Sequence, residues 1–352
     1  MAQGRRQCVP RQATLPHTWA CEPRIPGPRH GAARRQGDRG CGQLILSRRS
    51  RTMEPMSAEF EPVPETIADR YGVVIPPRWE RLLAETTGGV FRGGEFVVRV
   101  EPADPESVRW EHALLRFLAN EIEQVVAPLA ALDGSTFYVD DGHVVSVFPF
   151  LGGEELRSHE ALFQQELPTL LARLHRHAQA WPVTEQRPGV PSLRNRNWDR
   201  NDWWDWSLVE KPAPLVRAFE ELREWVADAD ELRVCAIHGD LHTGNVLVRD
   251  GRVAGIVDWQ YSRRDWPALE LAGMVWDLSW DGSSTTIDHA LRDDLVQRYV
   301  DSGGPGEAAA VVPMMRLESL VSALISLTRA AKGLPWNREF TRLLIATLDE
   351  LA

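Results

Sequence analysis

The sequence predicts an α+β protein with two lobes, a small and mainly β lobe followed by a larger and mainly α lobe. Short apolar runs separated by Gly-Gly or Asp-Gly turns fill residues 85–151, which is typical of β-hairpins. Beyond residue 153 the apolar residues recur with the helical period, and one further hairpin interrupts them at residues 246–257. At 352 residues the chain is long enough for each lobe to have its own core.

The first 52 residues differ in composition from the rest. They contain eleven Arg against Glu22 and Asp38, in a chain whose net charge is −10. The segment is rich in Pro and Gly and has no apolar period, which predicts a disordered basic tail at residues 1–52. We hypothesise that translation starts at Met53 or Met56. The remaining chain is strongly acidic, which argues against nucleic acid as a partner.

Cysteine usage and hydropathy bear on the compartment. Only Cys235 lies outside the tail, so no disulfide framework is expected and a reducing cytoplasm is favoured. We find no apolar run that approaches the ~18 residues of a membrane span. We therefore expect a cytoplasmic protein without a membrane partner, and the sequence leaves its oligomeric state open.

The small lobe begins with paired glycines. Gly88-Gly89 precede one β-rich run, and Gly93-Gly94 separate it from a second, which predicts a tight hairpin. Glycine would let backbone N–H groups approach phosphates closely, and a purely structural hairpin is the alternative.

A helix should follow, opened by an N-cap and a proline at residues 104–105. Glu111 shares one helical face with Val108, Leu115 and Leu118, so it interrupts an apolar stripe. A carboxylate facing a core needs a partner, and Arg99 at the end of the preceding strand is the natural candidate.

Another hairpin, residues 137–148, ends the small lobe at Phe148-Pro149-Phe150, where Pro and the following Gly152-Gly153 mark a change of direction. The larger lobe then begins with a long helix ending near Trp181, on which His175 and His177 are expected to be structural. Further helices are expected at residues 211–230, 288–300, 312–331 and 338–351.

The most informative segment is His238-Gly-Asp240-Leu-His242-Thr-Gly-Asn245, followed by a hairpin turning at Asp250-Gly251 and then by Asp258. A hairpin brings its two ends together, so Asn245 and Asp258 should be neighbours, with Asp240 on the same loop. Two carboxylates and an amide are hard oxygen donors, which suit Mg²⁺ better than Zn²⁺.

The spacing His-x-Asp-x-x-x-x-Asn resembles the catalytic loop of the protein-kinase-like fold, and Asp258 resembles its metal-binding Asp. Together with the following Val-Asp-Trp, the sequence of this segment resembles that of the aminoglycoside phosphotransferase family of small-molecule kinases. The resemblance covers about residues 85–278. The resemblance implies an ATP-binding lobe at residues 53–150 and a catalytic and substrate lobe at 151–352. It also implies Mg²⁺-dependent transfer of the γ-phosphate of ATP to a hydroxyl of an aminoglycoside-like antibiotic or metabolite.

The same resemblance implies roles for the loop. Asp240 would orient the acceptor hydroxyl and take its proton late, and His238 would shape the loop. Asn245 and Asp258 would hold Mg²⁺.

In the small lobe, Arg99 fixed by Glu111 would contact the α- and β-phosphates, although the family usually has Lys at this place. A plain ion pair is the alternative. Phe148 and Phe150 would flank the adenine at the hinge between the lobes, the backbone of this hinge would hydrogen-bond the base, and a buried linker is the alternative.

Two other functions remain open. One is a non-catalytic nucleotide-binding protein of the same fold, although the intact loop argues against it. The other is a metal hydrolase using His238, Asp240 and His242, although the neighbouring glycines favour a loop over the strand that would align the three side chains. A protein kinase is disfavoured because the loop lacks the Arg of His-Arg-Asp.

Three further features matter. Thr243 stands where the family often has Pro, and Glu270 stands where many members have Asp, at a position expected to brace the catalytic loop. The Trp- and Asp-rich residues 197–206 could hold a cationic or sugar-like acceptor, and Trp packing on the lobe surface is the alternative.

Overall fold

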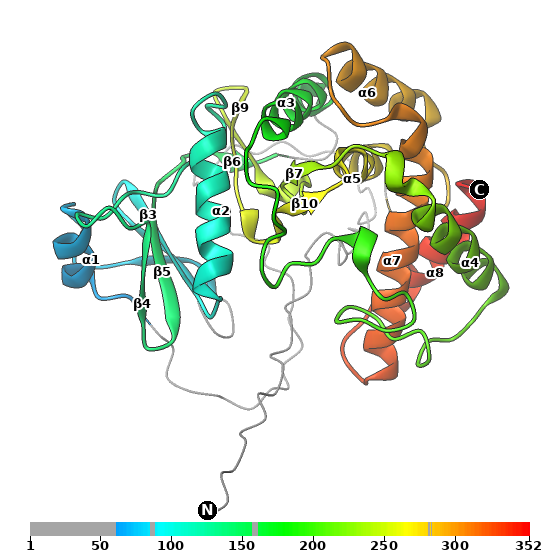
Figure 1. Ribbon diagram of the computed structural model, residues 1–352, viewed down its shortest axis with the longest axis horizontal. Helices are drawn as coiled ribbons and strands as arrows, with labels where there is room; N and C mark the ends of the chain where they lie inside the picture. Colours follow the sequence, from blue (N-terminus) through cyan, green and yellow to red (C-terminus); the bar gives the residue numbers. More distant parts are fainter. Residues whose placement is uncertain (1–60, 85–88, 157–160, 281, 283) are drawn as a thin grey trace, which may run out of the picture.

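The small lobe contains a five-stranded antiparallel sheet in the order β1-β2-β3-β5-β4 (Figure 1). This computed structural model describes residues 61–84, 89–156, 161–280, 282 and 284–352. The predicted tail, the first residues of the predicted ATP-binding lobe and Gly88 lie outside this range. The elements are α1 (Pro64–Tyr71), β1 (Glu80–Ala84), β2 (Gly89–Gly93), β3 (Phe96–Glu101), β4 (Phe137–Asp140) and β5 (His143–Pro149).

Both tight hairpins that fall on described residues of this lobe are present. β2 pairs with β3 across Gly94, which has a φ of 64°, and β4 pairs with β5 across the Asp141-Gly142 turn. Apolar side chains of these strands bury Ile67 and Tyr71 of α1, forming a small core of their own. The register places Arg99 opposite Ser146 of β5, so its backbone is fixed on both sides by the sheet.

Helix α2 (Pro105–Leu118) connects the lobes. The side chain of Asp104 caps it by accepting the N–H of Glu106 at 3.0 Å, as the sequence predicts. Its apolar residues Trp110, Leu114 and Leu118 belong to the core of the large lobe, although α2 leaves the sheet directly after β3. Glu111 is fully buried on this helix. Figure 1 shows α2 standing between the sheet and the large lobe.

The large lobe is mainly helical and contains every helix predicted for it. The predicted helices are α3 (Ala161–Gln179), α4 (Ala213–Ala227), α6 (His289–Asp301), α7 (Val311–Ala331) and α8 (Arg338–Glu350). The structure adds α5 (Pro267–Ser279), which was not predicted. α7 packs against α4, α5 and α8 at the centre of this lobe. The segment Ala308–Ala331 is long and apolar enough to cross a membrane, so the expectation of no such run was wrong. However, 72% of its most apolar window is buried, as in the central helix of a folded core.

Short strands flank the predicted loop and form the predicted hairpin. β7 (Cys235–Ile237) pairs with β10 (Arg263–Asp265) below the loop, and β8 (Val246–Arg249) pairs with β9 (Arg252–Ile256) as the predicted hairpin. β6 (Glu154–Glu155) extends that hairpin sheet directly after the interlobe linker. The turns η2 (Leu193–Asn195), η3 (Ala229–Glu231), η4 (Thr243–Asn245), η5 (Trp259–Tyr261) and η6 (Ala308–Ala310) complete the lobe. The two-lobed, kinase-like α+β fold predicted from the sequence is confirmed.

Candidate active site

The loop that follows β7 is held from below by one carboxylate. Glu270 of α5 accepts the backbone N–H of His238 at 3.1 Å and that of Gly239 at 2.6 Å. Gly239 has a φ of 82°, and a Cβ at this position would overlap the carbonyl oxygen of Tyr261. Glycine is therefore required here by both conformation and space. The bracing role expected of Glu270 fits these contacts.

Glu270 also continues into a buried polar network. Its Oε2 lies 2.8 Å from Nε2 of His175, whose Nδ1 lies 2.8 Å from the hydroxyl of Tyr299. Burial alone would raise the pKa of Glu270, but the hydrogen bond and charge of His175 and the loop N–H groups lower it. His175 is therefore structural, as predicted, and the carboxylate beneath the loop stays ionised.

His238 shapes the loop through both ring nitrogens. Its Nδ1 accepts the backbone N–H of Asp240 at 3.2 Å, so Nε2 carries the proton and donates to the carbonyl of Val257 at 2.9 Å. One neutral ring thereby fixes Asp240 on the loop and the residue before Asp258. Asp240 itself is 2% exposed.

The structure brings Asp240, Asn245 and Asp258 together, as the hairpin pattern predicts. Nδ2 of Asn245 donates to the carbonyl of Asp240 at 2.8 Å, and the carbonyl of Asn245 accepts the N–H of Val257 at 2.9 Å. This amide orientation leaves Oδ1 of Asn245 as a ligand atom. Asp258 has left-handed backbone angles, φ 64° and ψ 61°, which are uncommon outside glycine and recur at functional sites.

The donor types of Asn245 and Asp258, an amide oxygen and a carboxylate, fit Mg²⁺, which prefers hard oxygen ligands and keeps several waters. The zinc-type alternative does not fit. Nδ1 of His242 accepts the N–H of Gly244 at 3.0 Å, and both nitrogens of His238 are engaged by the loop. Across the described ranges, no cluster of three or more His, Cys, Asp or Glu side chains could hold a metal.

Thr243, where the family often has Pro, uses the N–H that proline lacks. Its backbone donates to Oδ2 of Asp277 at 3.0 Å, which ties the loop to α5 at a second point. The departure from the family pattern is therefore accommodated.

Arg99 and Glu111 form the predicted pair. Nη1 of Arg99 lies 2.7 Å from Oε1 of Glu111, and Nη2 lies 2.7 Å from Glu101. Burial disfavours the charged guanidinium, yet Glu101 and Glu111 outweigh it and raise the pKa of Arg99, with a smaller contribution from Asp258. Arg99 thus lies within electrostatic reach of the proposed metal ligand.

The surroundings of Arg99 fit an anionic ligand. Its Nε has no hydrogen-bond acceptor in the part of the chain that the structure describes, so one buried donor remains for a phosphate oxygen. Glu111 stays ionised, because Arg99 and Arg187 outweigh the effect of burial and lower its pKa to about 2.

Arg187 was missed by sequence reasoning. It lies in the connection after α3, where no periodic pattern marks it, and it contacts Oε2 of Glu111 at 2.7 Å. Glu111 on an apolar helical face indicated that a cation must lie nearby. Because Arg99 already fulfilled this requirement, the sequence offered no reason to expect a second arginine.

Both linker residues contact arginines of the small lobe. The Cζ atom of Arg99 lies over the ring of Phe148, 5.5 Å from the ring centre. The Cζ atom of Arg92 lies over the ring of Phe150, 3.8 Å from the ring centre. The N–H of Phe150 donates to the carbonyl of Glu95 at 2.8 Å, so it is not available to a nucleotide base. Recognition of a base by Phe148 or Phe150 stays a prediction.

The Trp- and Asp-rich segment is packed. Trp203 and Trp204 are buried, Trp206 stacks on Phe219 at 4.0 Å, and Asp205 caps a turn by accepting the N–H of Ser207. These contacts favour the packing alternative over an acceptor site.

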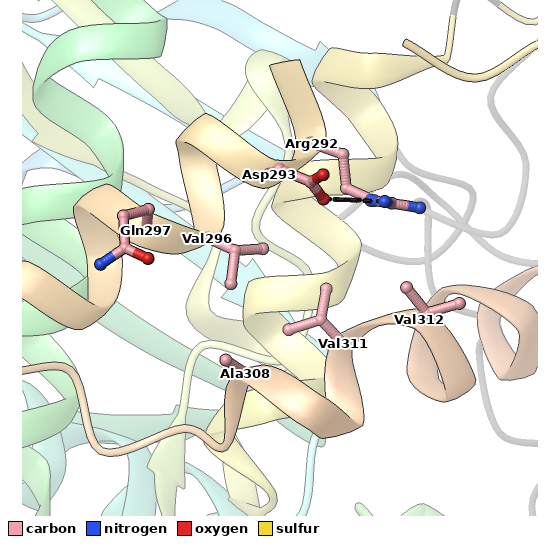
Figure 2. A pocket seen from close by; sticks show the side chains of 7 residues that line it. All are labelled: Arg292, Asp293, Val296, Gln297, Ala308, Val311 and Val312. Atoms are coloured by element: carbon pink, nitrogen blue, oxygen red, sulfur yellow. Dashed lines mark hydrogen bonds and ion pairs between the residues drawn. The ribbon is translucent and has the colours of Figure 1, made fainter. Parts of the chain in front are cut away.

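A hollow of about 240 Å³ lies elsewhere, between α6 and the start of α7 (Figure 2). Its charged lining residues, Arg292 and Asp293, pair with each other at 2.8 Å (Figure 2). It offers no group aimed at a ligand and does not compete with the interlobe junction.

The sequence profile of the phosphotransferase enzyme family matches residues 80–311. The chain belongs to this family. The match covers both lobes and every loop residue discussed above, and it confirms the resemblance to aminoglycoside phosphotransferases.

Among curated relatives, stress response kinase A of Salmonella choleraesuis (strain SC-B67) is 29% identical over 185 residues, 50% of this chain and 54% of the relative. Homoserine kinase of Rhizobium meliloti (strain 1021) is 29% identical over 178 residues, 48% and 52% of the two chains. The chain thus spans about half the length of these curated relatives.

Solved structures share the fold. An amicoumacin kinase in complex with AMP-PNP, Ca²⁺ and Ami matches with a TM-score of 0.61 at 13% identity, over 82% of this chain and 91% of that one. A spectinomycin phosphotransferase in complex with ADP and spectinomycin matches with a TM-score of 0.57 at 13% identity, over 82% and 93%. At this identity the likeness concerns the fold.

Proposed function

We propose that this protein is an ATP- and Mg²⁺-dependent phosphotransferase of the cytoplasm that moves the γ-phosphate of ATP to a hydroxyl group of a small molecule. The observation that carries the proposal is the convergence of Asp240, Asn245 and Asp258 on one loop and one hairpin. Asn245 bonds to the backbone of both Asp240 and Val257, so the loop that carries Asp240 is held against the residue before Asp258.

Each residue then has one task. Asp240 accepts a hydrogen bond from the acceptor hydroxyl, orients it and takes its proton as the bond to phosphorus forms. Oδ1 of Asn245 and the carboxylate of Asp258 would hold Mg²⁺. Arg99, aligned by Glu111, binds phosphate oxygens.

When bound, MgATP would supply the transferable phosphoryl group. Its Mg²⁺ would partly neutralise the negative charge of the phosphates. The protein contributes placement and electrostatics, because phosphoryl transfer needs little covalent work from side chains.

We further propose a small metabolite or an aminoglycoside-like antibiotic as the acceptor. Relatives named homoserine kinase and neighbours named for amicoumacin and spectinomycin support the class of small hydroxyl compounds. The packed Trp segment gives no support to a cationic acceptor site at residues 197–206.

The proposal is tested by incubating the full chain with MgATP and a panel of amino-acid, amino-sugar and antibiotic alcohols. Mass spectrometry should show an acceptor heavier by one phosphoryl group, and formation of ADP should depend on that acceptor. Binding of MgATP without transfer to any compound of the panel and without formation of ADP would instead favour a non-catalytic nucleotide-binding protein.

A further inference from the structure

Arg187 occupies an unusual position for an arginine. It is 3% exposed, and it lies in the large lobe on the connection between α3 and η2. Its guanidinium group contacts α2 and the turn η5, which immediately follows Asp258. A buried arginine is costly unless its donors are satisfied, so the number and direction of its bonds carry information.

The bonds of Arg187 point to two elements. On α2, Nη2 lies 2.7 Å from Oε2 of Glu111 and Nε donates to the hydroxyl of Ser107 at 2.9 Å. At η5 and the residue that follows it, Nη1 donates to the carbonyl of Trp259 at 3.0 Å and to the hydroxyl of Ser262 at 2.9 Å. One planar fork therefore fixes α2 against the backbone directly after Asp258.

Glu111 extends this link to Arg99. Its two carboxylate oxygens are divided between the two arginines, Oε1 to Arg99 and Oε2 to Arg187, each at 2.7 Å. The path thus runs from Asp258 along one residue of backbone to Trp259, then through Arg187 and Glu111 to Arg99.

Charge balance adds a second argument. Arg99 contacts two carboxylates, Glu101 and Glu111, which together would cancel more than its own charge. Arg187 contributes the second positive charge and burial raises the pKa of Glu101, so the cluster of two arginines and two glutamates carries no net negative charge and does not repel phosphate.

We propose that Arg187 is a positioning residue that couples the phosphate-binding Arg99 to the metal-binding Asp258. The inference rests on the proposed function. Arg187 touches neither nucleotide nor metal. It holds the two groups that do so at a fixed separation, so the nucleotide and Mg²⁺ bind more tightly together than either would alone.

The test measures the dissociation constant of AMP-PNP by calorimetry with and without Mg²⁺. The ratio of the two constants reports the coupling between metal and nucleotide, and a merely structural arginine would leave this ratio unchanged. In Arg187→Gln we expect the ratio to fall by about tenfold, which is the effect of losing one charge-assisted hydrogen bond. A matched control is Arg316→Gln, because Arg316 of α7 is also buried and bonds to Leu348 and Glu221 away from the junction.

Arg187→Lys keeps the charge but not the planar fork, and it carries the test if the glutamine variant does not fold. We expect it to lower the coupling nearly as far as glutamine does. Wild-type coupling in Arg187→Lys, or a lowered melting temperature with unchanged coupling in Arg187→Gln, would overturn the inference. Failure of the wild-type protein to bind AMP-PNP with Mg²⁺ would instead contradict the proposed function.

Discussion

The loop and hairpin between Gly239 and Asp258 and the buried charge cluster of Glu101, Arg99, Glu111 and Arg187 are built in different ways. In the first, twenty consecutive residues bring the catalytic side chains together, mostly through backbone bonds between near neighbours. In the second, residues from β3, α2 and the connection after α3 meet only when both lobes are assembled. The comparison teaches that the proposed catalytic loop is encoded locally, whereas the position of Arg99 relative to it depends on the whole fold.

The largest effect should come from the local region. In Asp240→Asn the side chain keeps its shape but loses the charge that attracts the acceptor proton. We expect kcat to fall by ~10²–10⁴, with little change in melting temperature or in the affinity for MgATP. Steady-state kinetics with the acceptor identified by the panel provide the measurement. A decrease below tenfold would mean that the loop does not carry the chemistry.

Two glycine substitutions in the same region separate the cost of steric overlap from the cost of a positive φ. Gly239 and Gly251 both have positive φ, but a Cβ at Gly251 would meet no atom within 4 Å, whereas one at Gly239 would overlap the Tyr261 carbonyl. We expect Gly251→Ala to cost ~1 kcal/mol of unfolding free energy and Gly239→Ala ~3 kcal/mol or more. Denaturant unfolding of both variants measures this. Equal losses would show that the catalytic loop is not packed as tightly as described.

The buried charge cluster should instead affect how the unfolding free energy depends on pH, through His112 next to Glu111. Burial lowers the pKa of His112, next to Glu111, from 6.5 to about 3, and its Nδ1 contacts the hydroxyl of Thr136 at 2.9 Å. Below pH 6.5 the unfolded chain binds a proton that folded His112 does not bind, so this group by itself lowers the unfolding free energy as the pH falls. Between pH 6.5 and 5 this group should contribute a loss of ~2 kcal/mol.

Replacing the ring isolates that contribution. His112→Asn keeps a polar side chain near Thr136 but cannot titrate, so its stability should depend less on pH in this range than that of the wild type. Glu111 does not interfere, because its depressed pKa of about 2 affects stability only below pH 4.5. Parallel pH profiles of the two proteins would show that His112 is not buried as a neutral ring.

The sequence predicted the local loop and hairpin better than the dispersed charge cluster. The hairpin turn at Asp250-Gly251 and the spacings from Asp240 to Asn245 and from β9 to Asp258 determine the loop by local rules, and the structure brings the backbone of these residues together. Turn chemistry and helical periodicity also predicted the two lobes. The predicted pairing of Arg99 with Glu111 succeeded because a buried carboxylate needs a cation and one lay close in sequence.

The rest depended on contacts between distant segments. Nothing near Arg187 shows that it reaches α2, and the approach of His175 to Glu270 joins residues 95 positions apart. The availability of the Phe150 N–H depended on Glu95 across the sheet. The apolar run in α7 escaped notice because scattered polar residues interrupt it, although its average hydropathy is high. These features follow from packing, which one sequence does not display.

The central claim is that Asp258, in a local hairpin, and Arg99, in a dispersed cluster, form one MgATP site. The most direct measurement is the melting temperature of the full chain with Mg²⁺ alone, ATP alone and both, in the wild type and in Asp258→Asn. Asn tolerates the left-handed backbone, so this variant should fold normally. We predict a rise that needs both ligands, equivalent to ~2.7 kcal/mol at 100 times the dissociation constant, and a much smaller rise in the variant. No rise at millimolar MgATP, or an equal rise in Asp258→Asn, would contradict the account.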